Sequence, residues 1–237
     1  MKTDLIALNN ELNEKGIFKI PEYIDSSTLI SLNNEFDNAI NKANTGIKIT
    51  PYSLGNCARV NANEFDKSKF PETTNVFYST FFKKIAENYL GSDINLNEEI
   101  FMVKDVVESK HYANDLHYDV VKTFKFFIYL TDTTSENGAF QCVPGSHKKT
   151  EEYRVKYGDK INFNNREITR KLDLEDFSPP ISIEGKAGTL IIFDTDLWHR
   201  AGKVFKGERK VMRGHTRKTN LTKQLKKRSL FNILFNK

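Results

Sequence analysis

The sequence has few of the residues that cross-link small proteins and no run that would place a protein in a membrane. Its 237 residues include only two cysteines, Cys57 and Cys142, which lie far apart without a C-x-x-C pair. They support neither a disulfide framework nor a structural zinc site, so a reducing cytoplasm is the expected compartment. The apolar run 5–8 is too short and too polar at its flanks for a signal peptide. Runs such as 126–130 have the length of strands, so no membrane span is expected.

A large excess of charge of one sign is also missing. Lys and Arg number 36 against 31 Asp and Glu, which gives a net charge of +5 and an isoelectric point near 9.0. So small an excess favours an anionic partner only weakly. The basic segment 217–228 is interpreted as the solvated face of a terminal helix, and nucleic acid is an unlikely partner because no aromatic stacking platform lies nearby. With 38% hydrophobic residues the chain is typical of a globular protein, and one domain over 1–237 is the default.

Helical patterns occupy the first part of the chain and strand patterns the rest. Helices are expected at 5–15, from the Asp25 cap to about residue 44, and at 77–90. Strands are expected at 17–20, 100–107, 123–130, 139–143, 181–183, 189–193 and 210–216. The stretch 47–70 has the composition of a loop. Many short strands with long connections predict a mainly β fold, a jelly-roll with flanking α-helices.

The segment 148–180 is long, highly charged and without regular periodicity. A linker between two domains has such a composition. However, a loop of this length inside a compact domain is more often functional. The strands before and after it are also expected to pack together in one domain. We therefore expect a lid or insertion here.

A metal site is indicated by His117-Tyr118-Asp119. On a strand, residues two apart point to the same face, so the imidazole and the carboxylate can converge on one ion. His199 follows 80 residues after Asp119, behind the buried strand 189–193 and a polar turn. Two histidines and one carboxylate leave open positions for a co-substrate and dioxygen, which suits iron(II) better than zinc. An H-x-D pair alone, however, is a weak signal.

The sequence around these residues adds specificity. The segments Gly16-Ile-Phe-Lys-Ile-Pro-Glu-Tyr-Ile-Asp25, Phe126-Phe-Ile-Tyr-Leu-Thr-Asp132, Glu136-Asn-Gly-Ala-Phe-Gln-Cys-Val-Pro-Gly-Ser-His147 and 188–199 occur in an order that resembles the phytanoyl-CoA dioxygenase family. The resemblance runs from about residue 10 to 216. It implies a double-stranded β-helix, which is a cupin-like jelly-roll, and the cofactors iron(II), 2-oxoglutarate and dioxygen. The implied reaction hydroxylates a C–H bond of a small molecule and releases succinate and CO2. Because Asp119 is present, hydroxylation is favoured over halogenation.

Arg209 is expected to bind the distal carboxylate of 2-oxoglutarate, since members of this family carry an arginine shortly after the distal histidine. A guanidinium binds a carboxylate with two parallel hydrogen bonds and keeps its charge. Arg213, on the same strand face, is the reserve candidate. Relatives usually have a serine where this chain has Ala201, so a second contact must come from elsewhere, with Lys104 and Lys125 as candidates.

Two other classes of protein stay open. A cupin-like metal isomerase or hydrolase would have a similar metal face but no need of Arg209, and a non-catalytic relative would not be expected to keep all three ligands. His147 is explained equally well by a structural role in its turn and by a position near the metal. His215 is expected to be packed or exposed, and Trp198 is expected to pack against its neighbours rather than to contact a substrate. The substrate is expected to be a small molecule, and the positive charge favours an anionic or carrier-linked one.

Overall fold

The computed structural model describes residues 4–41, 48–52, 55–61, 66–107, 109, 114–157 and 178–223. Most of the expected lid, 158–177, lies outside these ranges, as does the basic segment from residue 224 onward. Within the ranges, no helix is both long and apolar enough to cross a membrane.

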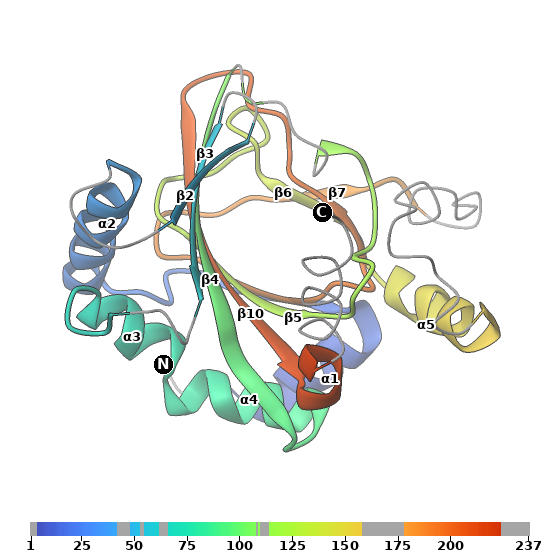
Figure 1. Ribbon diagram of the computed structural model, residues 1–237. Coiled ribbons are helices and arrows are strands. Elements are labelled where there is room, and N and C mark those ends of the chain that lie inside the picture. Colours follow the sequence, from blue (N-terminus) through green and yellow to red (C-terminus); the bar gives the residue numbers. More distant parts are fainter. Residues whose placement is uncertain are drawn as a thin grey trace, which may run out of the picture.

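Two antiparallel sheets enclose the barrel of a jelly-roll (Figure 1). In the described part of the chain, the larger sheet runs in the order β1-β8-β5-β10-β4-β3-β2 and the smaller one in the order β7-β6-β9. The bounds are β1 Ile17–Ile20, β2 Lys48–Tyr52, β3 Gly55–Asn61, β4 Ile94–Val106, β5 Phe124–Tyr129, β6 Phe140–Val143, β7 Ile181–Ile183, β8 Leu190–Asp194, β9 Trp198–Arg200 and β10 Glu208–Lys218. The mainly β fold with flanking helices is confirmed.

Helices cover the outer face of the larger sheet (Figure 1). They are α1 Leu5–Lys15, α2 Ser26–Ile40, α3 Pro71–Phe77 and α4 Thr80–Leu90, while α5 Ser146–Tyr157 lies at one side of the barrel and contacts the end of α1 through His147. The Asp25 carboxylate accepts hydrogen bonds from the backbone N–H groups of Ser27 and Thr28, which satisfies donors at the start of α2. Gly16 ends α1 with a φ of 75°, a conformation that glycine adopts without a steric penalty.

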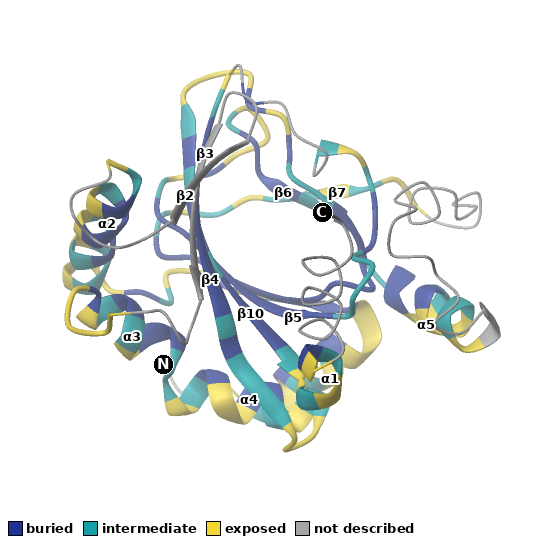
Figure 2. Cartoon of the chain, in the orientation of Figure 1, coloured by how far each residue is buried: buried dark blue, intermediate teal, exposed yellow. Residues whose placement is uncertain are grey.

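Alternation along the strands divides the apolar residues between two cores (Figure 2). The outer core joins the helices to side chains such as Met102, Phe126 and Met212. The inner core, inside the barrel, contains their strand neighbours Phe101 and Phe127. Every residue of β5 and β8 is buried, because both faces of these strands are covered. The inner face is the one that carries the polar site.

Two expectations from the sequence were wrong. The stretch 47–70 was expected to be a loop, but β2 and β3 lie there, and β3 pairs with β4 in a register that sets Cys57 opposite Val103. Pairing with a distant strand outweighs local composition. The helix expected at 77–90 begins later, at Thr80, where Ser79 accepts a hydrogen bond from the Phe82 N–H and so caps α4, and a separate helix, α3, precedes it.

Candidate metal centre

Backbone pairing brings the two ligand-bearing segments together. His117 and His199 form an isolated antiparallel bridge, with N···O distances of 3.0 and 2.8 Å, which extends the smaller sheet beyond β9. The Asp119 N–H donates to the Thr195 carbonyl at 2.9 Å, in the turn that precedes β9. The H-x-D segment is thus a single bridge rather than the regular strand expected.

The three side chains converge as the sequence predicts. Asp119 Oδ1 lies 3.6 Å from His117 Nε2 and 3.7 Å from His199 Nε2, and all three ligand atoms lie within 4.8 Å of one another. An ion bound at roughly 2.1 Å from each atom would need them about 3 Å apart, a small movement of side chains. The donor set therefore fits one metal ion bound on one face.

Second hydrogen bonds orient both imidazoles. His117 Nδ1 lies 2.6 Å from the Asp115 carbonyl, and His199 Nδ1 lies 2.6 Å from the Leu197 carbonyl. A carbonyl only accepts, so each Nδ1 carries the proton and each Nε2 presents a lone pair toward Asp119. Burial and the neighbouring His117 lower the pKa of His199 to about 3, which keeps this ring neutral as a metal ligand requires.

Lys125 holds the carboxylate in place. Its Nζ lies 2.6 Å from Asp119 Oδ2, the oxygen that faces away from the imidazoles, and only 5% of Lys125 is exposed. Burial alone would raise the pKa of Asp119, but the Lys125 ammonium and the two histidines hold it well below its usual range. Asp119 is thus ionised, with one oxygen fixed by Lys125 and the other directed to the metal position.

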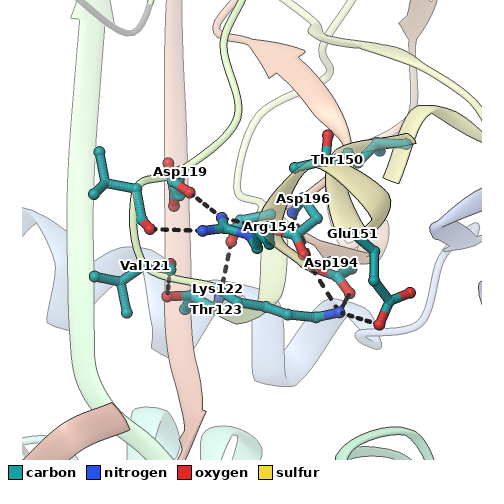
Figure 3. A network of polar contacts seen from close by, with 12 residues as sticks. Asp119, Val121, Lys122, Thr123, Thr150, Glu151, Arg154, Asp194 and Asp196 are labelled. Atoms are coloured by element: carbon teal, nitrogen blue, oxygen red, sulfur yellow. Dashed lines mark hydrogen bonds and ion pairs between the residues drawn. The ribbon is translucent and has the colours of Figure 1, made fainter. Parts of the chain in front are cut away.

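A polar network behind the site ties α5 to both ligand segments (Figure 3). Arg154 of α5 donates to the carbonyls of Asp119 and Val120 at 2.6 and 2.9 Å. Its Nε donates to the Asp196 carboxylate at 2.8 Å, three residues before His199. Lys122 also approaches Asp196, at 3.4 Å. Sequence reasoning missed this network, because Arg154 stands in a segment whose composition suggested only a lid.

The triad opens into a cavity of about 130 Å³ inside the barrel, and Arg209 lies on the same cavity wall. Arg209 is only 2% exposed and forms a buried ion pair with Asp105, its partner in the register between β10 and β4. Its hydrogen bonds use Nε and Nη2 toward Asp105 and Nη1 toward the Gly138 carbonyl. A guanidinium has five N–H donors, so these bonds leave one hydrogen on each of Nη1 and Nη2 for an acceptor in the cavity.

The Glu136-Asn137-Gly138 turn explains how Gly138 reaches Arg209. Asn137 Oδ1 accepts from the Thr134 N–H at 2.6 Å, and its Nδ2 donates to the carbonyl of Asp132 at 2.7 Å. Gly138 has a φ of 91°, and a Cβ at this position would lie 2.9 Å from the Gly202 carbonyl oxygen. Only glycine suits this backbone and this close approach.

The other candidate residues fall in different places. Lys104 faces away from the cavity and pairs with Glu208 at 2.7 Å, because side chains alternate along β4 and Asp105 occupies the inward position. Its position does not suit a contact with the co-substrate. Lys125 and Arg213 both line the cavity. So does His215, which sequence reasoning had assigned to packing.

Two side chains next to the site pack against neighbouring elements. His147 Nε2 lies 3.2 Å from the Asn13 carbonyl at the end of α1, and His147 is not part of the cavity wall. Trp198 is buried against Tyr118, with ring centroids 5.6 Å apart, and donates to Thr150 at 3.1 Å. Both positions agree with structural roles.

Comparison with known proteins places this geometry among oxygenases. A family model described as phytanoyl-CoA dioxygenase (PhyH) matches residues 12–210. A search of curated proteins gave no match. The epimerase SnoN from nogalamycin biosynthesis, described as non-heme and alpha ketoglutarate dependent, is similar in structure, with 15% identity, a TM-score of 0.63, and coverage of 90% of this chain and 82% of that chain.

Two further solved structures resemble the chain. HygX from Streptomyces hygroscopicus, with nickel, 2-oxoglutarate and hygromycin B bound, has 16% identity, a TM-score of 0.62, and coverage of 92% of this chain and 88% of that chain. EctD from S. alaskensis, in its apoform, has 13% identity, a TM-score of 0.63, and coverage of 91% and 78%. At these identities the likeness to solved structures shows the fold alone.

Proposed function

Because this chain belongs to the phytanoyl-CoA dioxygenase family, we propose that it is an iron(II)- and 2-oxoglutarate-dependent oxygenase that hydroxylates a C–H bond of a small molecule. The observation that carries the proposal is the convergence of His117, Asp119 and His199 at one end of a cavity that also holds the buried Arg209. Two histidines and a carboxylate with open positions are the ligand set of non-haem iron(II) oxygenases.

His117, Asp119 and His199 would hold the metal, and each is already oriented for the task. The Nδ1–H hydrogen bonds keep the imidazole lone pairs directed to the metal position, and Lys125 leaves one Asp119 oxygen to bind it. When bound, iron and 2-oxoglutarate together supply the oxidising chemistry, with succinate and CO2 as products of the co-substrate. The protein contributes orientation and a site shielded from water.

Arg209 is the residue proposed to bind the distal carboxylate of 2-oxoglutarate. Its remaining Nη1 and Nη2 hydrogens can donate to two carboxylate oxygens, while Asp105 and Gly138 prevent the side chain from rotating. Ala201, also on the cavity wall, supplies no hydroxyl, so binding of the distal carboxylate depends on the fixed Arg209 guanidinium. Arg209→Met should therefore raise the Kd for 2-oxoglutarate without removing the metal.

The test is spectroscopic and needs no substrate. Under anaerobic conditions, iron(II) and 2-oxoglutarate should produce the weak visible charge-transfer band of the chelate. Asp119→Ala and His199→Ala should lose it, and Arg209→Met should need more 2-oxoglutarate to reach it. Metal binding that survives loss of Asp119 would refute the ligand assignment.

Product analysis then decides the reaction. With oxygen present, the protein should convert 2-oxoglutarate to succinate and add one oxygen atom to its substrate. SnoN is described as an epimerase, so consumption of 2-oxoglutarate alone does not establish hydroxylation. A product of unchanged mass would contradict that part of the proposal.

A further inference from the structure

One basic residue in the cavity has no acidic partner among the described residues. Lys125 is paired with Asp119 and Arg209 with Asp105. Arg213 also lines the cavity, but it forms no ion pair with a described carboxylate, and its buried Nε has no hydrogen-bond partner among the described residues. Because Arg213 is half-buried, a positive charge without an acidic partner is costly there, and a ligand anion would relieve that cost.

His215 presents a second donor beside Arg213. It is only 7% exposed, and its Nε2 has no hydrogen-bond partner among the described residues. Its Nδ1 lies 3.3 Å from Arg217 Nη2, and because arginine only donates, Nδ1 must accept and Nε2 must carry the proton. Burial, together with the nearby cations Lys125, Arg217 and Arg213, holds the pKa of His215 well below its usual value. The ring therefore offers a neutral N–H donor.

One aromatic ring supports both groups. The Arg213 guanidinium lies 4.9 Å from the centre of the Phe101 ring, and the His215 ring lies 4.6 Å from it. Residues two apart on a strand share a face, so Arg213 and His215 both point inward from β10. The result is a pair of adjacent donors above an apolar platform.

This position is close to the metal and separate from Arg209. His215 is the cross-strand partner of Lys125, whose ammonium contacts Asp119. Arg209, by contrast, lies four residues before Arg213, about 13 Å away along an extended strand. Arg209 is held by Asp105, whereas Arg213 lies over the Phe101 ring, so the two guanidinium groups are held at different positions on the cavity wall and can bind two anionic groups.

We infer that Arg213 and His215 bind an anionic group of the oxidised substrate, a carboxylate or a sulfate ester, and thereby position its carbon skeleton over the metal. The inference rests on the proposed function, because it takes Arg209 as the grip for 2-oxoglutarate. It assigns the substrate to the class of small organic anions.

The experiment uses the protein loaded with nickel(II) and saturating 2-oxoglutarate, which does not turn over. Acetate and methyl sulfate serve as probes in calorimetric titrations. The wild type should bind at least one of them saturably, and Arg213→Met and His215→Phe should weaken that binding at least tenfold. Arg213→Lys and His215→Gln, which keep a charge or an N–H donor, should recover part of it. Arg200→Met is the matched control, since Arg200 lies beside His199 but bonds to Gln141 at 2.6 Å outside the cavity wall.

The outcomes separate this inference from the proposed function. If Arg213→Met raises the Kd for 2-oxoglutarate tenfold, Arg213 holds the co-substrate and the inference is overturned. It is also overturned if neither probe binds to the wild type, or if binding survives in both Arg213→Met and His215→Phe. If the wild type fails to bind nickel and 2-oxoglutarate, the proposed function fails, and the same titrations on metal-free protein still decide whether Arg213 binds anions.

Discussion

Replacing Arg154 by methionine should weaken both the fold and the metal site, although Arg154 touches no metal ligand side chain. The methionine keeps the apolar stem and removes the hydrogen bonds to the Asp119 and Val120 carbonyls and to Asp196. Asp196 is fully buried, and breaking a buried ion pair from one side costs about 3 to 5 kcal/mol. Because Lys122 remains 3.4 Å from Asp196, we expect the low end, about 3 kcal/mol. For a chain of this length, that lowers Tm by roughly 6 to 12 °C.

The same substitution removes the hydrogen bond that holds the Asp119 backbone carbonyl. Loss of such supporting contacts typically weakens metal binding about 10- to 100-fold. Trp198 is the only tryptophan and is adjacent to His199, so its fluorescence can follow a nickel(II) titration. Lys186→Met is the control, because its ion pair with Asp132 is as short, at 2.7 Å, but exposed to solvent, so its loss should hardly change stability. If Arg154→Met matches this control in Tm and in nickel affinity, the network does not support the site.

Two further predictions concern charges near the site. Lys125→Met should lower the Tm of the metal-free protein, because it leaves Asp119 without its cation. Nickel(II) should then raise the Tm of this variant more than that of the wild type, because only the metal neutralises Asp119. An equal rise in both proteins would show that Lys125 does not neutralise Asp119. Burial lowers the pKa of His147, so the unfolded chain takes up a proton below pH 6.5 that the folded chain does not, and stability falls as pH falls. His147→Gln should reduce the slope of the free energy of unfolding against pH by up to about 1.4 kcal/mol per pH unit. Urea unfolding of the metal-free protein between pH 7.5 and 5.5 measures this slope. An unchanged slope would mean that the pKa of His147 is the same in the folded and unfolded chain.

The convergence of His117, Asp119 and His199 could be predicted from the sequence, because part of its geometry is local. His117 and Asp119 are two residues apart, and strand parity places them on one face wherever the segment pairs. His199 follows a fully buried strand, whose apolar run is visible without a structure. The order of the surrounding motifs then indicated the family, whose fold agreed with the jelly-roll predicted from the short strands.

Contacts between distant residues could not be predicted in the same way. The inward position of Asp105 depends on the register of β4 against β10, which local composition does not reveal. The strand β3 owes its conformation to pairing with β4, and β2 to pairing with β3, despite the turn-forming residues in them. A possible signal for Asp105 was a carboxylate in phase with the apolar residues Val103 and Phe101.

The summed charge of the cavity wall indicates a substrate that carries one negative charge. Lys125, Arg209 and Arg213 face only two carboxylates, Asp105 and Asp119, which leaves one positive charge. Iron(II) and the dianion of 2-oxoglutarate would cancel each other, so the same single positive charge remains in the loaded site. A neutral substrate would leave it uncompensated in a low-dielectric cavity, whereas one anionic group beside Arg213 would balance it. The charge balance of the loaded site thus agrees with the inference from Arg213, which is the source of this single positive charge.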